Sequence, residues 1–214
     1  MKYTHIIFDL DGTLVDSASE IYEAAVVVCR KHDLATPSLD YIRSMTGSPP
    51  RLFFLDHGCC EADVEERVFE FRSYLAAHAG DPACVFPAVV HVLSQLQQHE
   101  IRISLATTKP SALADTLLER YGLSPYFAHI QGTDPPLQHK PHPDILHACM
   151  DKASPGAVAM VGDTVFDVEA AHNSAIDSIA VCSGAHSQER LAGARPTFLI
   201  RSLDEILGIL ELPS

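Results

Sequence analysis

Two aspartates, one residue apart, follow directly on an apolar run near the start of the chain. Ile6-Ile7-Phe8 leads into Asp9, and Asp11 comes two positions later in the stretch FDLDGTLV. The two-residue offset puts both side chains on one side of an extended segment, and Gly12 lets the backbone turn sharply after it. Like charges this close raise each other's pKa unless something positive holds them. The pair therefore predicts a bound cation.

Further polar side chains come where other predicted strands end. Thr107 follows one apolar run, and Asp163 follows another, with Asp167 four positions later. Lys140 lies in the stretch HKPHPD, ahead of a predicted helix. Because ligands of an open parallel sheet bind at the carboxyl ends of its strands, we expect these groups to meet Asp9 at one edge. Carboxylates, a hydroxyl and a lysine would then converge on one site.

The second half of the chain alternates short apolar runs with helical ones. Apolar runs of this length are typical of strands that are buried on both faces. Strands separated by helices predict a parallel sheet with helices on both sides, and therefore an α/β fold. The predicted strands cover residues 4–8, 101–106, 129–131, 157–161 and 178–182, and the predicted helices cover 87–99, 111–121, 143–152 and 165–174.

Residues 16–82 show a different pattern. Apolar residues recur at helical spacing in 16–32 and more clearly in 64–78. Shorter helix-like pieces, punctuated by glycine and proline, lie between these two runs. We therefore expect residues 1–15 and 83–214 to form one α/β domain, with an all-helical domain inserted after the first strand. The two connections of the insertion are natural hinges.

The composition is that of a globular protein of 214 residues, of which 47% are hydrophobic and 20% charged. A formal charge of −13 repels nucleic acid and anionic membrane surfaces, so we expect neither as a partner. No apolar run has the length of a membrane span, and Asp9 and Asp11 interrupt the first run, so the sequence favours the cytoplasm. The six cysteines lack metal-binding spacing and are expected to be buried or partly buried free thiols. No feature specifies an oligomeric state.

Several motifs occur in the order found in a known superfamily. They are Asp-x-Asp-Gly-Thr followed by Leu-Val-Asp-Ser, a threonine at a strand end (Thr107), Lys-Pro-His-Pro-Asp from Lys140, and Gly-Asp-Thr-x-x-Asp from Gly162. With these motifs the chain resembles the haloacid dehalogenase superfamily, and within it the phosphoglycolate-phosphatase-like hydrolases with a small helical cap. The resemblance implies a Rossmann-like core with an inserted cap. It also implies a Mg²⁺-dependent phosphatase that acts on a small phosphorylated metabolite through an aspartyl-phosphate.

The resemblance implies catalytic roles for four of the motif residues. Asp9 would be the nucleophile, and a carboxylate suits this role because it is already ionised at neutral pH. Asp11 would protonate the leaving oxygen and then act as the base on the hydrolytic water. Thr107 would hydrogen-bond the phosphoryl oxygens, and Lys140 would neutralise charge on the phosphate and on Asp9.

The implied metal site uses the same strand ends. Mg²⁺ would be held by Asp9, by the backbone carbonyl of Asp11 and by Asp163, because a small, hard cation selects oxygen ligands and bridges to phosphate. Asp167 would hold these ligands in place without binding the metal itself. This is the cation that the closely spaced pair of aspartates predicts.

Substrate contacts are expected from Gly12 and Thr108, which adjoin motif residues, and from the cap. Many relatives have Asn where this chain has Thr108, so contacts there can differ. In the cap, the loop GSPPR is the candidate, because Gly47 permits close approach and Arg51 could contact a substrate carboxylate or second anion. A solvated arginine after a helix-breaking Pro-Pro is the alternative for Arg51. The motifs assign no role to Lys109.

Single residues argue against several other reactions. A phosphonate-cleaving relative needs a cap lysine, but no lysine occurs between Lys31 and Lys109, and a dehalogenase has no need of the acid/base at Asp11. A phosphosugar mutase is the enzymatic alternative, although Ile21 stands where the resemblance places the hinge histidine of such mutases. A receiver-type phosphate sensor is the alternative from another class, but such domains are much shorter and lack a helical cap.

Overall fold

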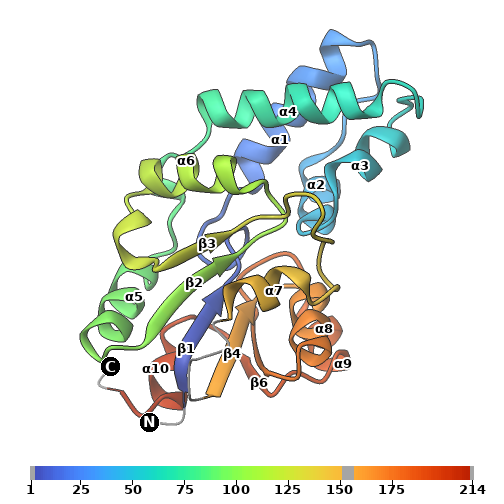
Figure 1. Cartoon of the computed structure of the whole chain (residues 1–214). Helices are drawn as coiled ribbons and strands as arrows, with labels where there is room; N and C mark the ends of the chain where they lie inside the picture. Colours follow the sequence, from blue (N-terminus) through green and yellow to red (C-terminus); the bar gives the residue numbers. More distant parts are fainter. Residues whose placement is uncertain (1–2, 151–156, 213–214) are drawn as a thin grey trace.

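A parallel sheet forms the centre of the structure, a computed structural model that describes residues 3–150 and 157–212. Its strands are β1 Tyr3–Phe8, β2 Arg102–Ala106, β3 His129–Gln131, β4 Ala157–Gly162, β5 Asp177–Val181 and β6 Phe198–Ile200. They form a six-stranded sheet in the order β3-β2-β1-β4-β5-β6, and every neighbouring pair is parallel (Figure 1). Because β1, β2 and β4 are neighbours, the polar residues that follow them meet at one edge of the sheet.

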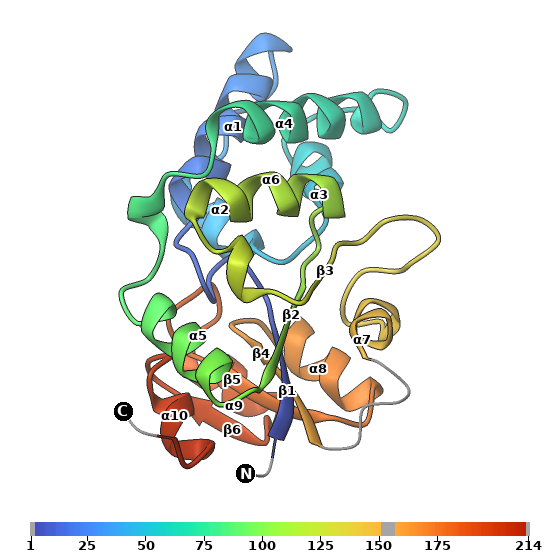
Figure 2. The same ribbon diagram turned by 60° about the vertical axis from the view of Figure 1, so that its left-hand side comes forward.

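Helices cover both faces of the sheet. They are α5 Val89–Gln98, α6 Ser111–Tyr121, α7 Asp144–Cys149, α8 Val165–Asn173, α9 Gln188–Gly193 and α10 Glu205–Ile209. Ile6 and Phe8 of β1 belong to one apolar cluster with α5, α6 and α10, whereas Ile7 belongs to another with α7 and α8. Figure 2 shows α5 and α10 on one side of the strands and α7 and α8 on the other. This burial on two faces explains the continuous apolar runs of the strands.

Four helices, all within the described residues, occupy the segment between a first linker, residues 9–17, and a second linker, residues 79–88. These helices, α1 Ala18–Lys31, α2 Leu39–Met45, α3 Pro50–Asp56 and α4 Val64–His78, are called the cap, and they lie above the carboxyl edge of the sheet in Figure 1. An aromatic cluster joins α3 to α4: the buried Phe54 ring lies 4.0 Å from Phe53 and 6.0 Å from Phe71, measured between ring centroids. The structure therefore confirms a helical insertion after the first strand.

Two linkers join the cap to the sheet and run side by side. Val15 in the first linker forms an isolated β-bridge with Val85 in the second. Glu20 of α1 also ties the second linker to the core, because its carboxylate accepts hydrogen bonds from Gly80 N at 2.8 Å and from Tyr121 Oη at 2.6 Å. The expected domain boundaries, and the use of the linkers as hinges, stay predictions.

The structure confirms the predicted strands and helices, with most ends shifted by one or two residues. The helix predicted over 143–152 ends at Cys149, and residues 151 and 152 lie outside the described residues. The sequence pattern did not predict β6, α9 or α10. These elements are short, and β6 is a partly buried edge strand, so none carries a periodic pattern long enough to detect.

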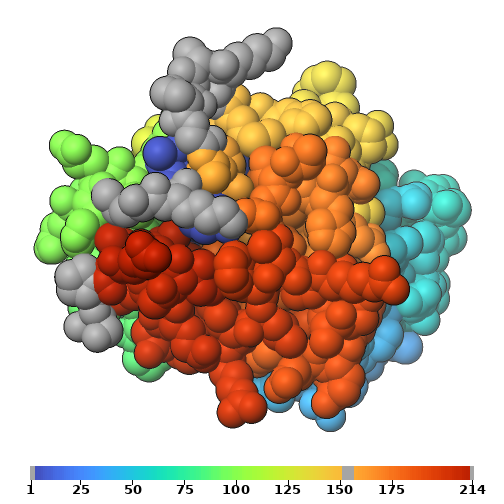
Figure 3. Space-filling model, turned by 90° about the horizontal axis from the view of Figure 1, so that it is seen from below, coloured from blue at the N-terminus to red at the C-terminus, as the bar shows by residue number. Residues whose placement is uncertain are grey.

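The end of the molecule opposite the cap is formed largely by the C-terminal part of the chain (Figure 3). The helices in the described residues are each too short or too polar to span a bilayer. All six cysteines lie among the described residues as free thiols, and five are buried or partly buried as predicted, but the prediction is wrong for Cys60. Cys59 is buried and Cys60 is exposed.

An ion-pair network joins the two long cap helices. Glu70 of α4 accepts hydrogen bonds from Lys31 at 2.8 Å and from Arg67 at 3.0 Å, and its carboxylate lies 3.0 Å from His32 Nε2. The hydrogen bonds with Lys31 and then His32 lower the pKa of Glu70 to about 2. The Glu70 side chain is 19% exposed, so solvent screens these pairs in part.

We expect Glu70→Gln to lower the free energy of unfolding by about 1 kcal/mol at pH 7. The pKa of Glu70 is lower in the folded than in the unfolded state. Its contribution is therefore full above the unfolded value of about 4.3 and is lost as the pH falls toward the folded value of about 2. The difference in unfolding free energy between wild type and variant should shrink over this window in urea titrations followed by circular dichroism.

Glu66→Gln is the control for this prediction. Glu66 lies on the same helix, is 66% exposed and pairs with Arg67 at 3.4 Å. Its substitution should change the free energy of unfolding by less than about 0.5 kcal/mol. A wild-type advantage over Glu70→Gln that stays constant between neutral and strongly acidic pH would contradict the assignment.

Candidate active site

The turn after β1 presents Asp9 and Asp11 at the carboxyl edge of the sheet. Asp9 continues the β1 ladder, since its backbone N–H donates to the Val161 carbonyl of β4 at 2.9 Å. The chain then turns through Gly12, which has a φ of +80°. Asp9 and Asp11 are only 3% and 6% exposed. Carboxylates that are so deeply buried need partners of opposite charge or several hydrogen bonds.

Lys140 lies between two of the buried carboxylates. Its Nζ is 2.9 Å from Asp9 Oδ1 and 2.5 Å from Asp167 Oδ1, and it donates to the Ala106 carbonyl at 3.1 Å. Ala106 is the last residue of β2, so the ammonium is fixed beside Thr107. Burial lowers the pKa of Lys140, but the carboxylates of Asp167 and Asp9 raise it above its ordinary value, so the ammonium stays charged.

Asp163 is held from two directions. It is fully buried after β4, and its Oδ1 accepts from Thr13 Oγ1 at 2.9 Å while its Oδ2 accepts from Ala185 N at 2.7 Å. Each oxygen keeps a second lone pair for another partner. A Cβ at Gly12 or at Gly184 would overlap the Asp163 carboxylate. The turn after β1 and the loop after β5 therefore need glycine at these positions.

Asp167 is fixed by the start of α8. Its Oδ2 accepts the backbone N–H of Thr164 at 3.0 Å and the Thr164 hydroxyl at 2.6 Å, and the two residues form a capping box. Its other oxygen accepts from the Lys140 ammonium. A Cβ at Gly162 would overlap the Asp167 side chain. Asp167 thus helps to cap the start of α8 and orients Lys140 at the same time.

The cluster carries more negative than positive charge. One carboxylate oxygen from each of Asp9, Asp163 and Asp167 lies within 4.8 Å of the others. Burial raises the pKa of Asp9 to about 7, in spite of Lys140, and burial together with repulsion by Asp167 and Asp9 raises the pKa of Asp163 well above its ordinary value. Buried carboxylate oxygens with raised pKa values fit a hard divalent cation, which would favour their ionised forms.

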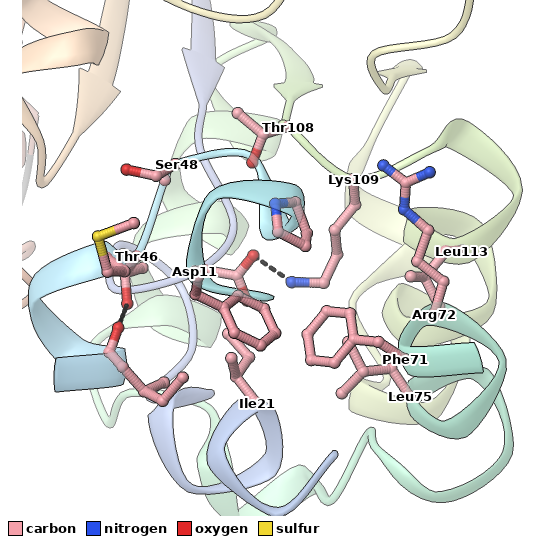
Figure 4. Close-up of a pocket in the computed structure, with 15 residues that line it drawn as sticks. Asp11, Ile21, Thr46, Ser48, Phe71, Arg72, Leu75, Thr108, Lys109 and Leu113 are labelled. Carbon is pink, nitrogen blue, oxygen red and sulfur yellow. Dashed lines mark hydrogen bonds and ion pairs between the residues drawn. The ribbon is translucent and has the colours of Figure 1, made fainter. Parts of the chain in front are cut away.

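Asp11 has separate partners. Its Oδ1 accepts from Ser17 Oγ at 2.5 Å, and its Oδ2 pairs with the Lys109 ammonium (Figure 4). Ser17 belongs to the Leu-Val-Asp-Ser part of the first motif, so the motif held a signal for it. The sequence contains no signal for Lys109, because its ion pair forms only when the loop after β2 lies against the turn after β1.

Thr107 is fully buried where β2 ends. Its carbonyl accepts from Thr133 Oγ1 at 3.4 Å, and its Oγ1 accepts from Lys109 N at 3.3 Å. These bonds do not use the Thr107 O–H, which keeps a proton to donate. The structure thus brings Asp9, Lys140, Asp163 and Asp167 into direct contact or close proximity, with Thr107 alongside.

A cavity of about 60 Å³ lies between Asp11 and the cap (Figure 4). Gly47 and Thr108, both predicted from the sequence, line this cavity. Gly47 has a φ of +84°, and a Cβ there would lie 3.2 Å from Thr164 Cγ2, so the cap backbone approaches the core closely at this point. Arg72 of α4 also lines the cavity, which the sequence pattern did not indicate.

Arg51 is not among the residues that line this cavity. Its guanidinium pairs with Glu61 at 2.8 Å and with Glu65 at 3.3 Å, and its side chain is 42% exposed. The structure therefore favours the solvated alternative for Arg51 over contact with a substrate. The cap arginine that lines the cavity is Arg72. Only the packing of α3 and α4 shows that Arg72 lies there and that Arg51 does not.

Comparison with known proteins defines the class to which this fold and site belong. The chain matches the model of the haloacid dehalogenase-like hydrolase family over residues 6–181. The match covers most of the chain, so the chain belongs to this family. The predicted resemblance is therefore confirmed.

Individual relatives point to phosphatases within the family. The chain is 34% identical over 212 residues to a Dickeya dadantii protein named probable phosphatase IndB, with 95% of this chain and 91% of that protein aligned. It is 32% identical over 190 residues to the phosphoglycolate phosphatase of Caulobacter vibrioides, with 84% and 79% aligned. A solved haloacid dehalogenase-like hydrolase from Streptococcus pneumoniae has a TM-score of 0.86 at 27% identity, covering 97% of this chain and 98% of that one. The chain is thus a phosphatase-type hydrolase of the family.

We expect Gly12→Ala to disrupt the site through Asp163. The added Cβ would overlap the Asp163 carboxylate, and a displacement of about 1 Å is enough to lower a catalytic rate about 100-fold. The φ of +80° adds backbone strain of about 1–2 kcal/mol. The measurements are kcat/KM for p-nitrophenyl phosphate and the free energy of unfolding.

Gly122→Ala is the control that separates the effect of backbone strain from the effect of a Cβ close to Asp163. Gly122 has a φ of +73°, but a Cβ added there meets nothing within 4 Å. Both variants should lose the stability that the backbone strain costs, Gly12→Ala should lose more because of the overlap with Asp163, and only Gly12→Ala should lose activity. Equal kcat/KM values for the two folded variants would show that the close approach to Asp163 does not matter.

Proposed function

We propose that the protein is a Mg²⁺-dependent phosphatase that hydrolyses a small phosphomonoester, such as phosphoglycolate, through an aspartyl-phosphate on Asp9. The observation that carries the proposal is the buried cluster of Asp9, Asp163 and Asp167 around Lys140. Unbalanced buried carboxylates destabilise a fold unless a cation binds them, and phosphoryl transfer uses a cation beside a nucleophile. The family and the relatives named as phosphatases support the same reaction.

The proposed reaction has two displacements at phosphorus. In the first, a carboxylate oxygen of Asp9 attacks phosphorus, and the bond to the leaving oxygen breaks as that oxygen takes a proton from Asp11. In the second, Asp11 takes a proton from a water molecule that attacks phosphorus, and the bond to Asp9 breaks to release inorganic phosphate. Asp11 suits the shuttle because it lines the cavity and Ser17 fixes one of its oxygens.

The remaining polar groups would bind and neutralise the phosphoryl group. Lys140, 2.9 Å from Asp9 Oδ1, would offset the charge that builds up beside the nucleophile, and the Thr107 hydroxyl would donate to a phosphoryl oxygen. Mg²⁺ would be held by Asp9, Asp163 and the Asp11 carbonyl, and would supply further stabilisation of charge on the phosphoryl oxygens. Asp167 would support the site by holding Lys140.

The cavity supports a small substrate. At about 60 Å³ it is small, which favours a small leaving group such as glycolate. Relatives named phosphoglycolate phosphatase align with most of this chain. Ile21 lines the cavity where the resemblance places the histidine of a mutase, and a hydrocarbon side chain cannot transfer a proton.

The test is phosphate release from phosphoglycolate, sugar phosphates, nucleotides and pyrophosphate, with Mg²⁺ and with a chelator. Release should require Mg²⁺, and Asp9→Asn should lower it at least about 1,000-fold, because the amide keeps the shape but cannot act as the nucleophile.

Asp115→Asn, at an exposed position on α6 and outside the motifs, is the matched control and should keep the wild-type rate. No release from any of these substrates by folded wild-type protein with Mg²⁺ would contradict the phosphatase proposal. Wild-type rates in Asp9→Asn would contradict the role of Asp9.

A further inference from the structure

Arg72 is a partly buried cation of the cap without a carboxylate partner. It lies on α4 and lines the cavity that also contains Asp11 (Figure 4). Within the described part of the chain, the structure records no hydrogen bond or ion pair for its guanidinium, whereas Arg51 and Arg67 are both paired with glutamates. A guanidinium that is withdrawn from water and unpaired destabilises the fold, so its position points to a ligand.

The two carboxylates whose charges act on Arg72 are engaged elsewhere. Glu65 and Asp134 act on the charge of Arg72, but Glu65 pairs with Arg51, and Asp134 accepts from the Ser111 backbone N–H at 3.2 Å. Burial lowers the pKa of Arg72, which is the direction expected for a guanidinium that has lost water without gaining a close partner.

The other cations of the site already have partners. Lys109 pairs with Asp11, and Lys140 pairs with Asp9 and Asp167. Arg72 is therefore the cation at the cavity that a negatively charged group on the leaving group could reach without displacing an ion pair.

The rest of the cavity wall is mostly apolar. Such a wall accepts a short carbon chain, and it offers the several hydroxyl groups of a sugar few neutral hydrogen-bond partners, namely the side chains of Thr46, Ser48 and Thr108. The apolar side chains that line it include Ile21, Ile42, Phe53, Phe71, Leu75 and Leu113.

We propose that Arg72 binds a carboxylate on the leaving group, so that the substrates are short phosphorylated hydroxy acids. With the phosphoryl group at Asp9, the carbon chain lies along the apolar wall and the carboxylate reaches the guanidinium. Arginine suits this role because it binds a carboxylate through two parallel hydrogen bonds. The inference rests on the proposed phosphatase function and names the substrate class of the same site.

The test compares phosphoglycolate with its neutral amide, which has nearly the same size. Wild-type protein should show a kcat/KM about 10- to 100-fold higher for the acid, as expected for hydrogen bonds between charged groups. In Arg72→Met this acid-to-amide ratio should fall to about 1, mainly through a higher KM for the acid. Arg72→Lys should keep part of the ratio, because lysine keeps the charge but not the paired N–H groups.

Arg51→Met is the matched control, because it removes the other candidate guanidinium of the cap. Arg51 is paired with Glu61 and Glu65 and exposed, so its removal should leave the acid-to-amide ratio as in wild type. A wild-type ratio in folded Arg72→Met would overturn the proposal, and so would a ratio lost in Arg51→Met. Circular dichroism checks that each variant folds.

A substrate without a carboxylate separates this inference from the phosphatase proposal. If p-nitrophenyl phosphate is hydrolysed but the ratio is unchanged in Arg72→Met, the role of Arg72 is overturned and the phosphatase stands. If wild-type protein hydrolyses no phosphomonoester, the phosphatase proposal fails. Calorimetric titration of phosphoglycolate and its amide into Asp9→Asn, with and without Arg72→Met, then decides the role of Arg72. Equal affinities in the presence of Arg72 would overturn it, and a preference for the acid that Arg72→Met removes would support it.

Discussion

The rest of the structure depends on placing several buried carboxylates around one ammonium group. Asp9 follows β1, Asp163 and Asp167 both follow β4, and Lys140 lies in the loop after β3, yet Lys140 Nζ lies 2.9 Å from Asp9 and 2.5 Å from Asp167. Bringing like charges together in a dry interior opposes folding. Only a rigid frame that is stabilised elsewhere can hold them. The parallel sheet is that frame, because its apolar strands are buried on both faces and end at one edge.

Close packing of the backbone against the site carboxylates also helps to fix them in place. Gly12, Gly162 and Gly184 each stand where a Cβ would overlap a site carboxylate, so the loops after β1, β4 and β5 are packed directly against Asp163 and Asp167. Each carboxylate then receives hydrogen bonds from fixed groups, as Asp163 does from Thr13 and Ala185. Groups that are fixed before a ligand binds need no reorganisation during the reaction, and this is the main source of electrostatic stabilisation in enzymes.

Local sequence patterns were enough to predict most of the fold and the central residues of the site. The strand ends at Asp9, Thr107 and Asp163 could be predicted because apolar runs and the polar residues after them are adjacent in sequence. Contacts between elements could not be predicted in this way. The GSPPR loop pointed to Arg51 and no pattern pointed to Arg72, and only the packing of the cap, which sets Arg51 beside Glu61 and Glu65 and Arg72 at the cavity, corrects this. The short elements β6, α9 and α10 were missed because a few residues do not establish a period.

The charge of the whole protein and the charge of the site act at different distances. A formal charge of −13 opposes the approach of an anion, but exposed charges are largely screened beyond a Debye length of about 8–10 Å. Inside the cavity, buried groups are screened much less. The charged side chains that line it are two cations, Lys109 and Arg72, and one carboxylate, Asp11. An anion that reaches the cavity therefore responds to a few nearby side chains rather than to the acidic surface. The core supplies the groups for the phosphoryl end and the cap supplies the wall for the leaving group, so changes in the cap can alter specificity while the chemistry below it is kept.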